Sequence, residues 1–295
     1  MTFGTLIDAA ALRDLLADGA RRGNTAVLDC RFDLKNPAAG RLAYLAGHIP
    51  GARFADLNRD LSSPVTADSG RHPLPSPAAL AAFFNAAGIG IDTQVVAYDE
   101  ANGSMAARAW WLLGWMGHRC AAVLDGGFAA WVQAGGPVES GAAAAAPPEP
   151  AAAPGAVPAR ANSDAVATSA EVEAMRADSR RLLVDARAPE RFAGAFEPLD
   201  QVAGHVPGAV NHPFTANLNA QGRFLPREEL RALWSQRLAG RSPRDMIAMC
   251  GSGVTACHNL LAMASAGLPG AKLYAGSWSE WIRDPRRPVA RGHAG

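Results

Sequence analysis

The chain has 295 residues, of which 49% are hydrophobic and 19% charged, and its 28 basic residues nearly balance its 27 acidic ones. This much apolar sequence can form substantial cores, which argues against a chain that is disordered throughout. The formal net charge of +1 gives no electrostatic reason to expect nucleic acid or an anionic membrane as a partner. At roughly 150 residues per domain, the length predicts two globular domains.

The cysteine content and the N-terminal sequence bear on the compartment. The chain carries four cysteines, Cys30, Cys120, Cys250 and Cys257. They are too few and too scattered for a disulfide scaffold, and no pair has zinc-finger spacing. Asp8, Arg13 and Asp14 interrupt the first apolar stretch, which argues against a signal peptide. Residues 109–117, the most apolar segment, fall far short of the roughly 20 residues that span a bilayer. We therefore expect a cytoplasmic protein with free thiols.

A change of composition near the middle divides the chain. Residues 142–146 are five alanines, and four closely spaced prolines follow within residues 147–154. Prolines at this spacing do not fit inside a helix or a central strand. We expect residues 140–164 to form an extended, semi-rigid connector between domains at 1–139 and 165–295.

The two halves repeat the same motifs in the same order. Residues 46–52 read Ala-Gly-His-Ile-Pro-Gly-Ala, and residues 203–209 read Ala-Gly-His-Val-Pro-Gly-Ala. Three further pairs keep the same order: 27–29 with 183–185, 95–99 with 246–250, and 123–131 with 273–281. The sequence therefore predicts a duplicated domain of about 120 to 130 residues, an ordinary domain size.

Each half alternates short apolar runs with amphipathic stretches. In chain order, we expect buried strands at 26–28, 94–98, 121–124, 182–184, 246–249 and 272–274. We expect helices at 77–87, 105–116, 169–176, 226–238 and 253–266. This alternation predicts an α/β fold in which each domain is a mostly parallel sheet flanked by helices. Ligands bind at the carboxyl ends of such strands, so the strand that stops at Cys250 is the prime candidate for a site.

The loop after this strand suits an anion. Gly251 and Gly253 permit backbone angles closed to other residues, and a helix is expected to begin near Val254 or Thr255. Successive amides at a helix N-terminus point into one concave space and favour a negative charge. The nearest candidate anion is the Cys250 thiolate, which such a loop would keep nucleophilic near neutral pH.

The same pattern would also fit a buried cysteine before an ordinary turn, because free cysteine is often a small core residue. The duplication favours the functional interpretation. The first half has Asp99 where the second has Cys250, and Glu100 follows it. An acid-rich loop is not expected to stabilise a thiolate or an incoming anion. Cys257 lies about two helical turns further on and is expected to face the core.

Cys250-Gly-Ser-Gly-Val-Thr-Ala resembles the active-site loop of tandem-rhodanese sulfurtransferases, specifically of the mercaptopyruvate branch. The two Gly-His-x-Pro-Gly-Ala motifs resemble that family's internal motif, and the resemblance covers nearly the whole chain apart from the connector and the last residues. It implies a non-catalytic first and a catalytic second rhodanese domain in a monomer. Cys250 would take a sulfane sulfur from thiosulfate or 3-mercaptopyruvate as a persulfide. Cyanide, a small thiol or a reduced thioredoxin-like protein would accept it, with no metal or organic cofactor.

The resemblance also implies residues that bind the donor. These substrate-binding candidates are Arg191, Gly251, Ser252, Gly253, Val254, Thr255 and His72. Residues 185–192 resemble the family segment whose second arginine holds the donor's anionic group, which is Arg191 here. The alternative for Arg191 is a surface arginine paired with Glu190. Arg187 is expected to pair with Asp185.

The preferred donor stays open on this sequence. The mercaptopyruvate branch usually adds an arginine nine positions beyond Arg191, where this chain has Asp200. The thiosulfate branch tends to place Arg-Lys directly after the cysteine, where this chain has Gly251 and Ser252.

Residues 70–75 resemble a family stretch whose histidine, His72 here, reaches the active site within a Ser–His–Asp arrangement. Ser252 matches the serine, but the expected acid falls near Asn58, which Asp56 and Asp60 flank, so the match is incomplete. A loop histidine that only orders its turn is the alternative for His72. His48 and His205 are expected to brace their Pro-Gly turns.

Two other functions share this loop type. A non-enzymatic persulfide-sensing or binding module would carry a reactive Cys250 without turnover. A cysteine phosphatase-like enzyme needs an arginine six residues after the cysteine, where this chain has Ala256.

Overall fold

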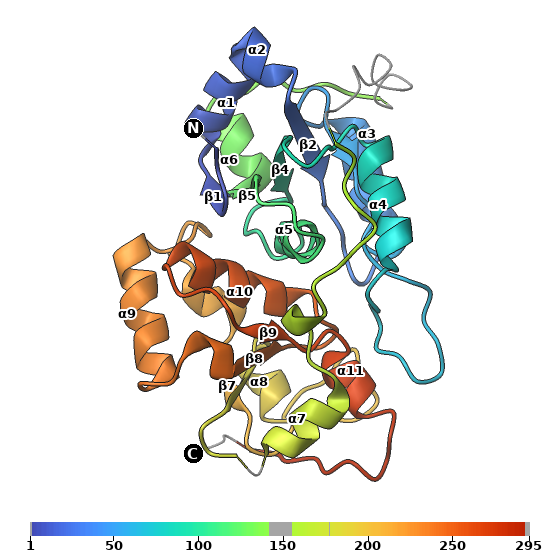
Figure 1. Cartoon of the computed structure of the whole chain (residues 1–295), viewed down its shortest axis with the longest axis vertical. Helices are drawn as coiled ribbons and strands as arrows, with labels where there is room; N and C mark the ends of the chain where they lie inside the picture. Colours follow the sequence, from blue (N-terminus) through green and yellow to red (C-terminus); the bar gives the residue numbers. More distant parts are fainter. Residues whose placement is uncertain (1, 142–154, 177, 293–295) are drawn as a thin grey trace. The chain divides into compact units, whose positions relative to one another are not determined.

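The computed structural model describes residues 2–141, 155–176 and 178–292. The chain divides into two compact units, drawn mainly in blue to green and mainly in yellow-green to red (Figure 1). The first unit comprises Met1–Ser62, Pro75–Asn162 and Ala220–Phe224, and the second comprises Ser63–Leu74, Ser163–Asn219 and Leu225–Gly295. Within the described residues, no helix is long and apolar enough to cross a membrane.

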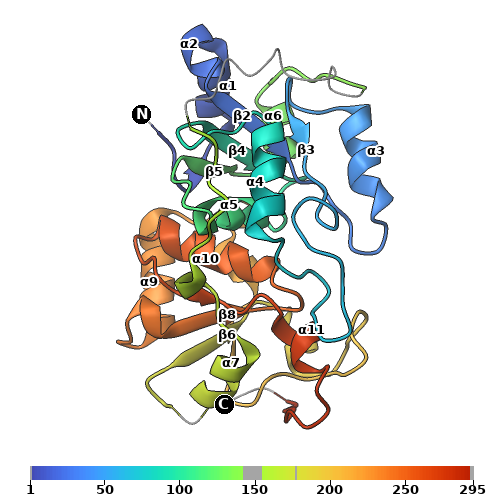
Figure 2. The same ribbon diagram turned by 45° about the vertical axis from the view of Figure 1, so that its right-hand side comes forward.

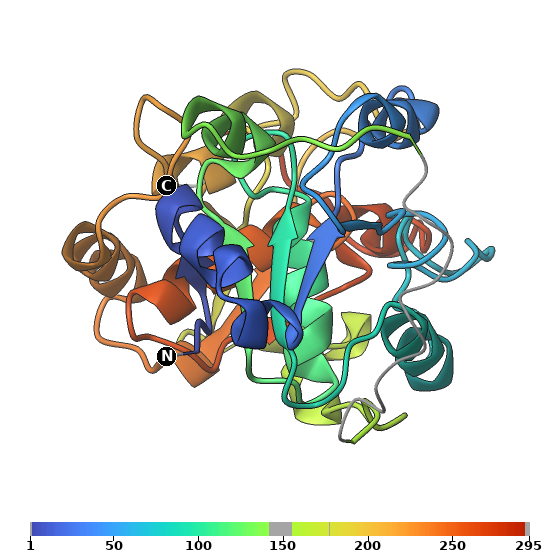
Figure 3. The ribbon, with the colours of Figure 1, turned by 90° about the horizontal axis from the view of Figure 1, so that it is seen from above.

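The first unit is built on a parallel sheet with strand order β1-β5-β4-β2-β3, and Figure 3 shows its strands running side by side with helices around them. The strands are β1 (Leu6–Ile7), β2 (Thr25–Asp29), β3 (Arg53–Phe54), β4 (Gln94–Tyr98) and β5 (Ala121–Leu124). The helices are α1 (Ala9–Ala17), α2 (Gly19–Arg22), α3 (Ala38–Ala46), α4 (Pro77–Ala86), α5 (Ala106–Trp115) and α6 (Gly127–Gln133). Leu12 of α1 and Trp131 of α6 pack with Val96 of β4 in one buried cluster. Such burial of apolar side chains between helix and sheet stabilises the layer.

The second unit has a parallel sheet with strand order β7-β6-β8-β9 (Figure 2). Its strands are β6 (Leu182–Asp185), β7 (Val210–Asn211), β8 (Met246–Met249) and β9 (Lys272–Leu273). Its helices are α7 (Ser169–Met175), α8 (Pro189–Phe192), α9 (Arg227–Leu238), α10 (Thr255–Ser265) and α11 (Ser277–Trp281), with short 3-10 turns at Ser163–Ala165, Phe214–Asn217 and Pro243–Asp245. A single parallel bridge from Val166 to Leu273 extends the sheet beside β9, as β1 extends the first sheet beside β5. The predicted fold of two parallel sheets flanked by helices is confirmed.

The duplication extends to individual hydrogen bonds. Arg31 binds Asp29 at the end of β2, and Arg187 binds Asp185 at the end of β6, each through Nε and Nη2. Each arginine also donates to the carbonyl of the glycine that precedes its motif histidine. The expected pairing of Arg187 with Asp185 is therefore confirmed. All four side chains are at most 5% exposed, so each arginine neutralises a carboxylate that burial would otherwise destabilise.

The two motif histidines brace their turns, as expected. His48 Nδ1 lies 2.9 Å from the carbonyl oxygen of Tyr44, and His205 Nδ1 lies 2.8 Å from that of Phe192. Each imidazole also stacks on the ring of the same partner residue. Both histidines are at most 2% exposed, so their role in these turns is structural.

The central connector differs in part from the sequence expectation. Residues 142–154 lie outside the described residues, and the following stretch is fixed to the first unit. The amide of Val157 donates to Asn85 Oδ1 at 3.0 Å, and that of Asn162 donates to the carbonyl of Trp115 at 2.9 Å. Residues 155–162 of the expected connector 140–164 are therefore part of the first unit.

The units also exchange segments, which the sequence analysis did not anticipate. Ser63–Leu74 from the first half of the chain belongs to the second unit, and Ala220–Phe224 from the second half belongs to the first. Both segments contain a Gly-Arg pair, at Gly70-Arg71 and Gly222-Arg223. The second unit is thus incomplete without a loop encoded in the first half.

Candidate active site

Cys250 lies directly after β8, whose four residues are all buried. The amide of Cys250 donates to Ser277 Oγ at 3.0 Å, and its carbonyl accepts from the amide of Trp278 at 3.0 Å. The amide of Ser279 donates to the carbonyl of Gly251 at 2.9 Å. The first turn of α11 therefore fixes the backbone of the cysteine loop.

The thiol of Cys250 accepts a backbone hydrogen bond within its own loop. The amide of Gly253 donates to Cys250 Sγ at 3.1 Å, and α10 begins two residues later at Thr255. Val254 is the N-cap of α10 and provides no side-chain cap, so the positive end of the helix dipole lies beside the sulfur. Cys250 is 2% exposed, which shields this interaction from water.

Gly253 is required by its backbone conformation. Its φ is +75°, in the left-handed region, and a Cβ placed there would lie 2.3 Å from the carbonyl oxygen of Ala275. No residue other than glycine can hold this turn without moving the backbone. The sequence prediction of a special conformation is confirmed at this position.

Gly251 has a different role from the expected one, because its φ lies outside the left-handed region. A Cβ on Gly251 would lie 2.9 Å from Nη2 of Arg71, and 3.5 and 3.6 Å from Nη2 and Nη1 of Arg191. The missing side chain thus makes room for two guanidinium groups beside the residue that follows the cysteine.

Arg191 binds two acidic side chains, neither of which is Glu190, the neighbouring carboxylate named as an example in the alternative interpretation. Its Nε and Nη2 donate to Glu197 at distances down to 2.7 Å, and Nη2 also donates to Asp200 at 3.3 Å. Arg71 Nη1 donates to the other oxygen of Asp200. Glu197 and Asp200 are 2% and 4% exposed. Burial alone would raise the pKa of Glu197, but the hydrogen bonds from Arg191 and two backbone amides lower it below its usual value, so it is ionised.

His72 and Ser252 come together as the resemblance implied. His72 Nδ1 lies 2.8 Å from Ser252 Oγ, and the two residues are 5% and 4% exposed. The acid expected near Asn58 lies in the first unit, where Asp56 Oδ1 accepts from the amides of Asn58 and Arg59 and caps its own turn. The contact between His72 and Ser252 therefore joins loop 63–74 to the cysteine loop.

The equivalent loop of the first unit surrounds a carboxyl group of its own. Asp99 Oδ1 accepts from the amides of Ala101 and Gly103 at 3.2 and 2.9 Å, and Oδ2 accepts from those of Met105 and Ala106 at 2.8 and 3.2 Å. The amides of this loop therefore converge on a side chain of the loop itself, which is 3% exposed. Burial raises the pKa of Asp99, although the hydrogen bonds from these amides oppose the shift.

A buried polar network behind α10 was not found from the sequence. The side chain of Asn217 accepts from Trp234 Nε1 at 3.0 Å, contacts His212 Nε2 at 3.2 Å and donates to Asn259 Oδ1 at 2.8 Å. Burial lowers the pKa of His212 to about 4, and the positive charge of Arg237 contributes in the same direction, although the hydrogen bond to Asn217 opposes it. These contacts tie α10 to the segment after β7 and so support the helix that begins at the cysteine loop.

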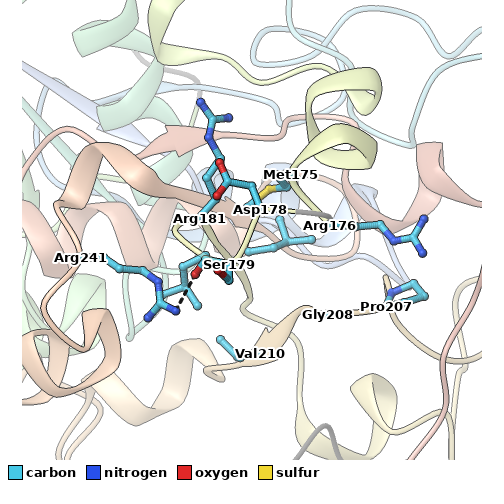
Figure 4. A pocket seen from close by; sticks show the side chains of 11 residues that line it. Met175, Arg176, Asp178, Ser179, Arg181, Pro207, Gly208, Val210 and Arg241 are labelled. Atoms are coloured by element: carbon cyan, nitrogen blue, oxygen red, sulfur yellow. Dashed lines mark hydrogen bonds between the residues drawn. The ribbon is translucent and has the colours of Figure 1, made fainter.

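A cavity of about 240 Å³ lies elsewhere in the second unit (Figure 4). Its lining includes Leu182 and Val210, which begin β6 and β7, together with Arg241, whose Nη2 donates to the carbonyl of Ser179 at 2.9 Å. Because Cys250 follows the carboxyl end of β8, it lies at the carboxyl ends of the parallel strands, whereas this cavity lies at their amino ends. It is separate from the candidate active site.

Comparison with known proteins agrees with this geometry. The rhodanese-like domain family matches residues 8–134 and 168–284. A "Probable 3-mercaptopyruvate sulfurtransferase" of Pseudomonas aeruginosa is 51% identical over 268 residues, covering 90% of this chain and 92% of the relative. The thiosulfate sulfurtransferase of Rattus norvegicus is 35% identical over 302 residues, covering 99% and 97%. The crystal structure of SseA from Escherichia coli, described as a 3-mercaptopyruvate sulfotransferase with the rhodanese fold, superposes with a TM-score of 0.76 at 33% identity, covering 94% of this chain and 100% of that one.

The chain belongs to the rhodanese-like domain family, which it contains twice. With relatives of this identity over nearly the whole length, it is a tandem-rhodanese sulfurtransferase and therefore an enzyme. The predicted family, fold class and reaction class are confirmed.

Proposed function

We propose that Cys250 is the sulfur carrier. Its thiolate attacks the transferred sulfur of the donor, which is the sulfane sulfur of thiosulfate or the thiol sulfur of 3-mercaptopyruvate. A sulfur–sulfur bond forms, and the donor's bond to that sulfur breaks. With thiosulfate the leaving group is sulfite. With 3-mercaptopyruvate it is the enolate of pyruvate, which then takes a proton. The hydrogen bond from Gly253 and the N-terminus of α10 support this role, because both stabilise negative charge on the sulfur.

Arg191 binds the anionic group of the donor in this proposal. Its guanidinium group lies against Gly251, next to the carrier, and its side chain is 17% exposed. Thiosulfate and 3-mercaptopyruvate both carry an anionic group beyond the transferred sulfur, so this contact serves either donor. The backbone of residues 251–255 forms the rest of the cradle.

His72 and Ser252 assist proton movement at the site. The hydrogen bond of 2.8 Å between them places an imidazole, a group suited to general acid–base catalysis, beside Ser252 of the cysteine loop. A leaving enolate needs a proton and a leaving sulfite does not. The pair therefore matters more for 3-mercaptopyruvate than for thiosulfate.

The second half-reaction returns Cys250 to its starting state. Cyanide attacks the outer sulfur of the persulfide, thiocyanate leaves, and the thiolate re-forms. A small thiol or a reduced thioredoxin-like protein would accept the sulfur in the same way. We place the enzyme in the cytoplasm as a monomer, consistent with four cysteines that form no disulfide in the described part of the chain.

We take residues 165–295 as the catalytic domain and residues 1–139 as the non-catalytic one, joined by 140–164; from the first half, loop 63–74 contributes to the site. The contrast between Asp99 and Cys250 supports this division. A carboxylate that already accepts four amide hydrogen bonds cannot accept a sulfur atom, whereas a thiolate in the equivalent loop can.

The observation that carries the proposal is the amide of Gly253 donating to Cys250 Sγ beside an uncapped helix N-terminus. The test is thiocyanate formation from thiosulfate and cyanide by the wild type, Cys250→Ala and Cys120→Ser. We expect Cys250→Ala to abolish turnover and Cys120→Ser to keep it. Turnover by Cys250→Ala would refute the assignment. A wild type that is alkylated at Cys250 but shows no turnover with any donor would instead favour the persulfide-sensing module.

A further inference from the structure

Arg71 is a second cation beside the carrier cysteine. A Cβ on Gly251 would be closer to Nη2 of Arg71, at 2.9 Å, than to any atom of Arg191. Within the described part of the chain, neither Nη2 of Arg71 nor Nη1 of Arg191 donates a hydrogen bond to protein. Both arginines therefore keep an N–H donor beside the cysteine loop, in a geometry suited to an anion.

The backbone position of Arg71 is set by the same helix that fixes the cysteine loop. Its amide donates to Ser279 Oγ at 3.0 Å, while the amide of Ser279 donates to the carbonyl of Gly251. Gly70 packs so closely on Gly276 that a Cβ there would lie 2.5 Å from the Gly276 carbonyl oxygen. Arg71 is thus held in register with the loop and is not a loosely placed surface residue.

The two carboxylates at the site are held differently. Glu197 accepts from the backbone amides of Leu199 and Asp200 at 3.0 and 3.2 Å in addition to its arginine contacts, and is fixed by its own turn. The carboxylate of Asp200 has hydrogen bonds only from Arg71 and Arg191 among the described residues. It occupies the position between two guanidinium groups that a bound anion would also use.

We infer that Arg71 recognises the anionic group of the donor together with Arg191, and that Asp200 competes with this group for the two guanidinium groups. The inference rests on the proposed function and names the residues that set its donor affinity. Arg71 supplies, from a distant loop, the second cation that is missing at position 200. Asp200 weakens the binding of every anionic donor, and it weakens a dianion more than a monoanion, because the repulsion scales with the donor's charge.

The first test compares steady-state kinetics with thiosulfate and 3-mercaptopyruvate in Arg71→Gln and Asp200→Asn. Loss of one charge-assisted hydrogen bond predicts an increase in KM of about tenfold for both donors in Arg71→Gln. Asp200→Asn should lower KM, by about tenfold for the dianion thiosulfate and about threefold for the monoanion 3-mercaptopyruvate. Arg71→Lys should lie between the wild type and Arg71→Gln, since it keeps the charge but not the planar fork. Arg180→Gln is the matched control, because Arg180 is 87% exposed and pairs only with Asp178 among the described side chains.

The second test does not depend on turnover. The rate of Cys250 alkylation is measured by peptide mass spectrometry with anionic iodoacetate and with neutral iodoacetamide, and Cys120 serves as the internal reference. The ratio of the iodoacetate rate to the iodoacetamide rate should fall about tenfold in Arg71→Gln and rise in Asp200→Asn, because only iodoacetate carries a charge that the two arginines attract. A wild type without turnover would refute the proposed function, and this ratio would still decide the role of Arg71.

The inference is overturned if Arg71→Gln keeps both the wild-type KM values and the wild-type alkylation ratio. It is also overturned if Arg71→Gln slows both reagents equally and lowers kcat without changing KM, because that pattern indicates a purely structural role. If Asp200→Asn lowers KM by the same factor for both donors, the proposed competition by Asp200 is refuted.

Discussion

Replacing the two glycines of the cysteine loop by alanine should have different effects, one on stability and the other on donor binding. In Gly253→Ala, the left-handed φ of +75° costs about 1–2 kcal/mol, and a Cβ 2.3 Å from a fixed backbone oxygen adds about 1–3 kcal/mol. In Gly251→Ala, the backbone is unstrained and the new Cβ meets only the mobile ends of Arg71 and Arg191. We expect Gly253→Ala to lose stability and Gly251→Ala to keep it but bind the donor less well.

Thermal unfolding and donor kinetics together separate the two effects. Gly253→Ala should lower Tm by roughly 5–20 °C. Gly251→Ala should leave Tm within about 2 °C of the wild type and raise the donor KM about fivefold, which corresponds to about 1 kcal/mol. The reasoning is refuted if Gly253→Ala melts with the wild type, or if Gly251→Ala melts early with an unchanged KM.

Three further predictions concern the supporting structure. Asp99→Asn replaces a carboxylate that accepts four amide hydrogen bonds, so we expect a loss of about 1–3 kcal/mol in the free energy of unfolding with an unchanged kcat; a denaturant titration with no loss would contradict this. Asn217→Ala leaves Trp234 Nε1 and Asn259 without their partner, which predicts a loss of about 2–4 kcal/mol, and the matched surface variant Asn24→Ala should lose far less. His212 has a pKa of about 4 when folded and an unperturbed value near 6.5, so the unfolded chain binds the extra proton between these values. The contribution of neutral His212 to the free energy of unfolding, about 3 kcal/mol at most, is therefore present above pH 6.5 and is lost as the pH falls toward 4. In His212→Phe, the difference in Tm between pH 7 and pH 4.5 should be smaller than in the wild type. An unchanged difference would exclude His212 as its source.

The central features of the fold follow from local sequence patterns. The predicted strands 94–98, 121–124 and 246–249 match β4, β5 and β8 because continuous apolar runs of this length fit a sheet buried on both faces. The predicted helix 253–266 contains α10, and the Gly-Ser-Gly turn correctly marks where it begins. Strands β1, β3 and β7 were missed, since two residues are too few to show any periodicity.

The parts of the site that depend on long-range contacts could not be predicted from local sequence patterns. Arg71 and Asp200 are 129 positions apart, and nothing near either residue in the sequence indicates that they meet. His72 was found only through a family resemblance, because it contacts Ser252 across 180 positions. The role of Gly251 was misassigned, since sequence alone does not distinguish a glycine needed for its φ from one needed for space.

The most direct test of the account is the mass of the protein after incubation with a sulfur donor in the absence of any acceptor. The account predicts that the peptide containing Cys250 gains the mass of one sulfur atom, that adding cyanide removes it, and that thiocyanate appears in equal amount. An unchanged mass at Cys250, or an added sulfur on Cys257 or Cys120 instead, would contradict the central claim.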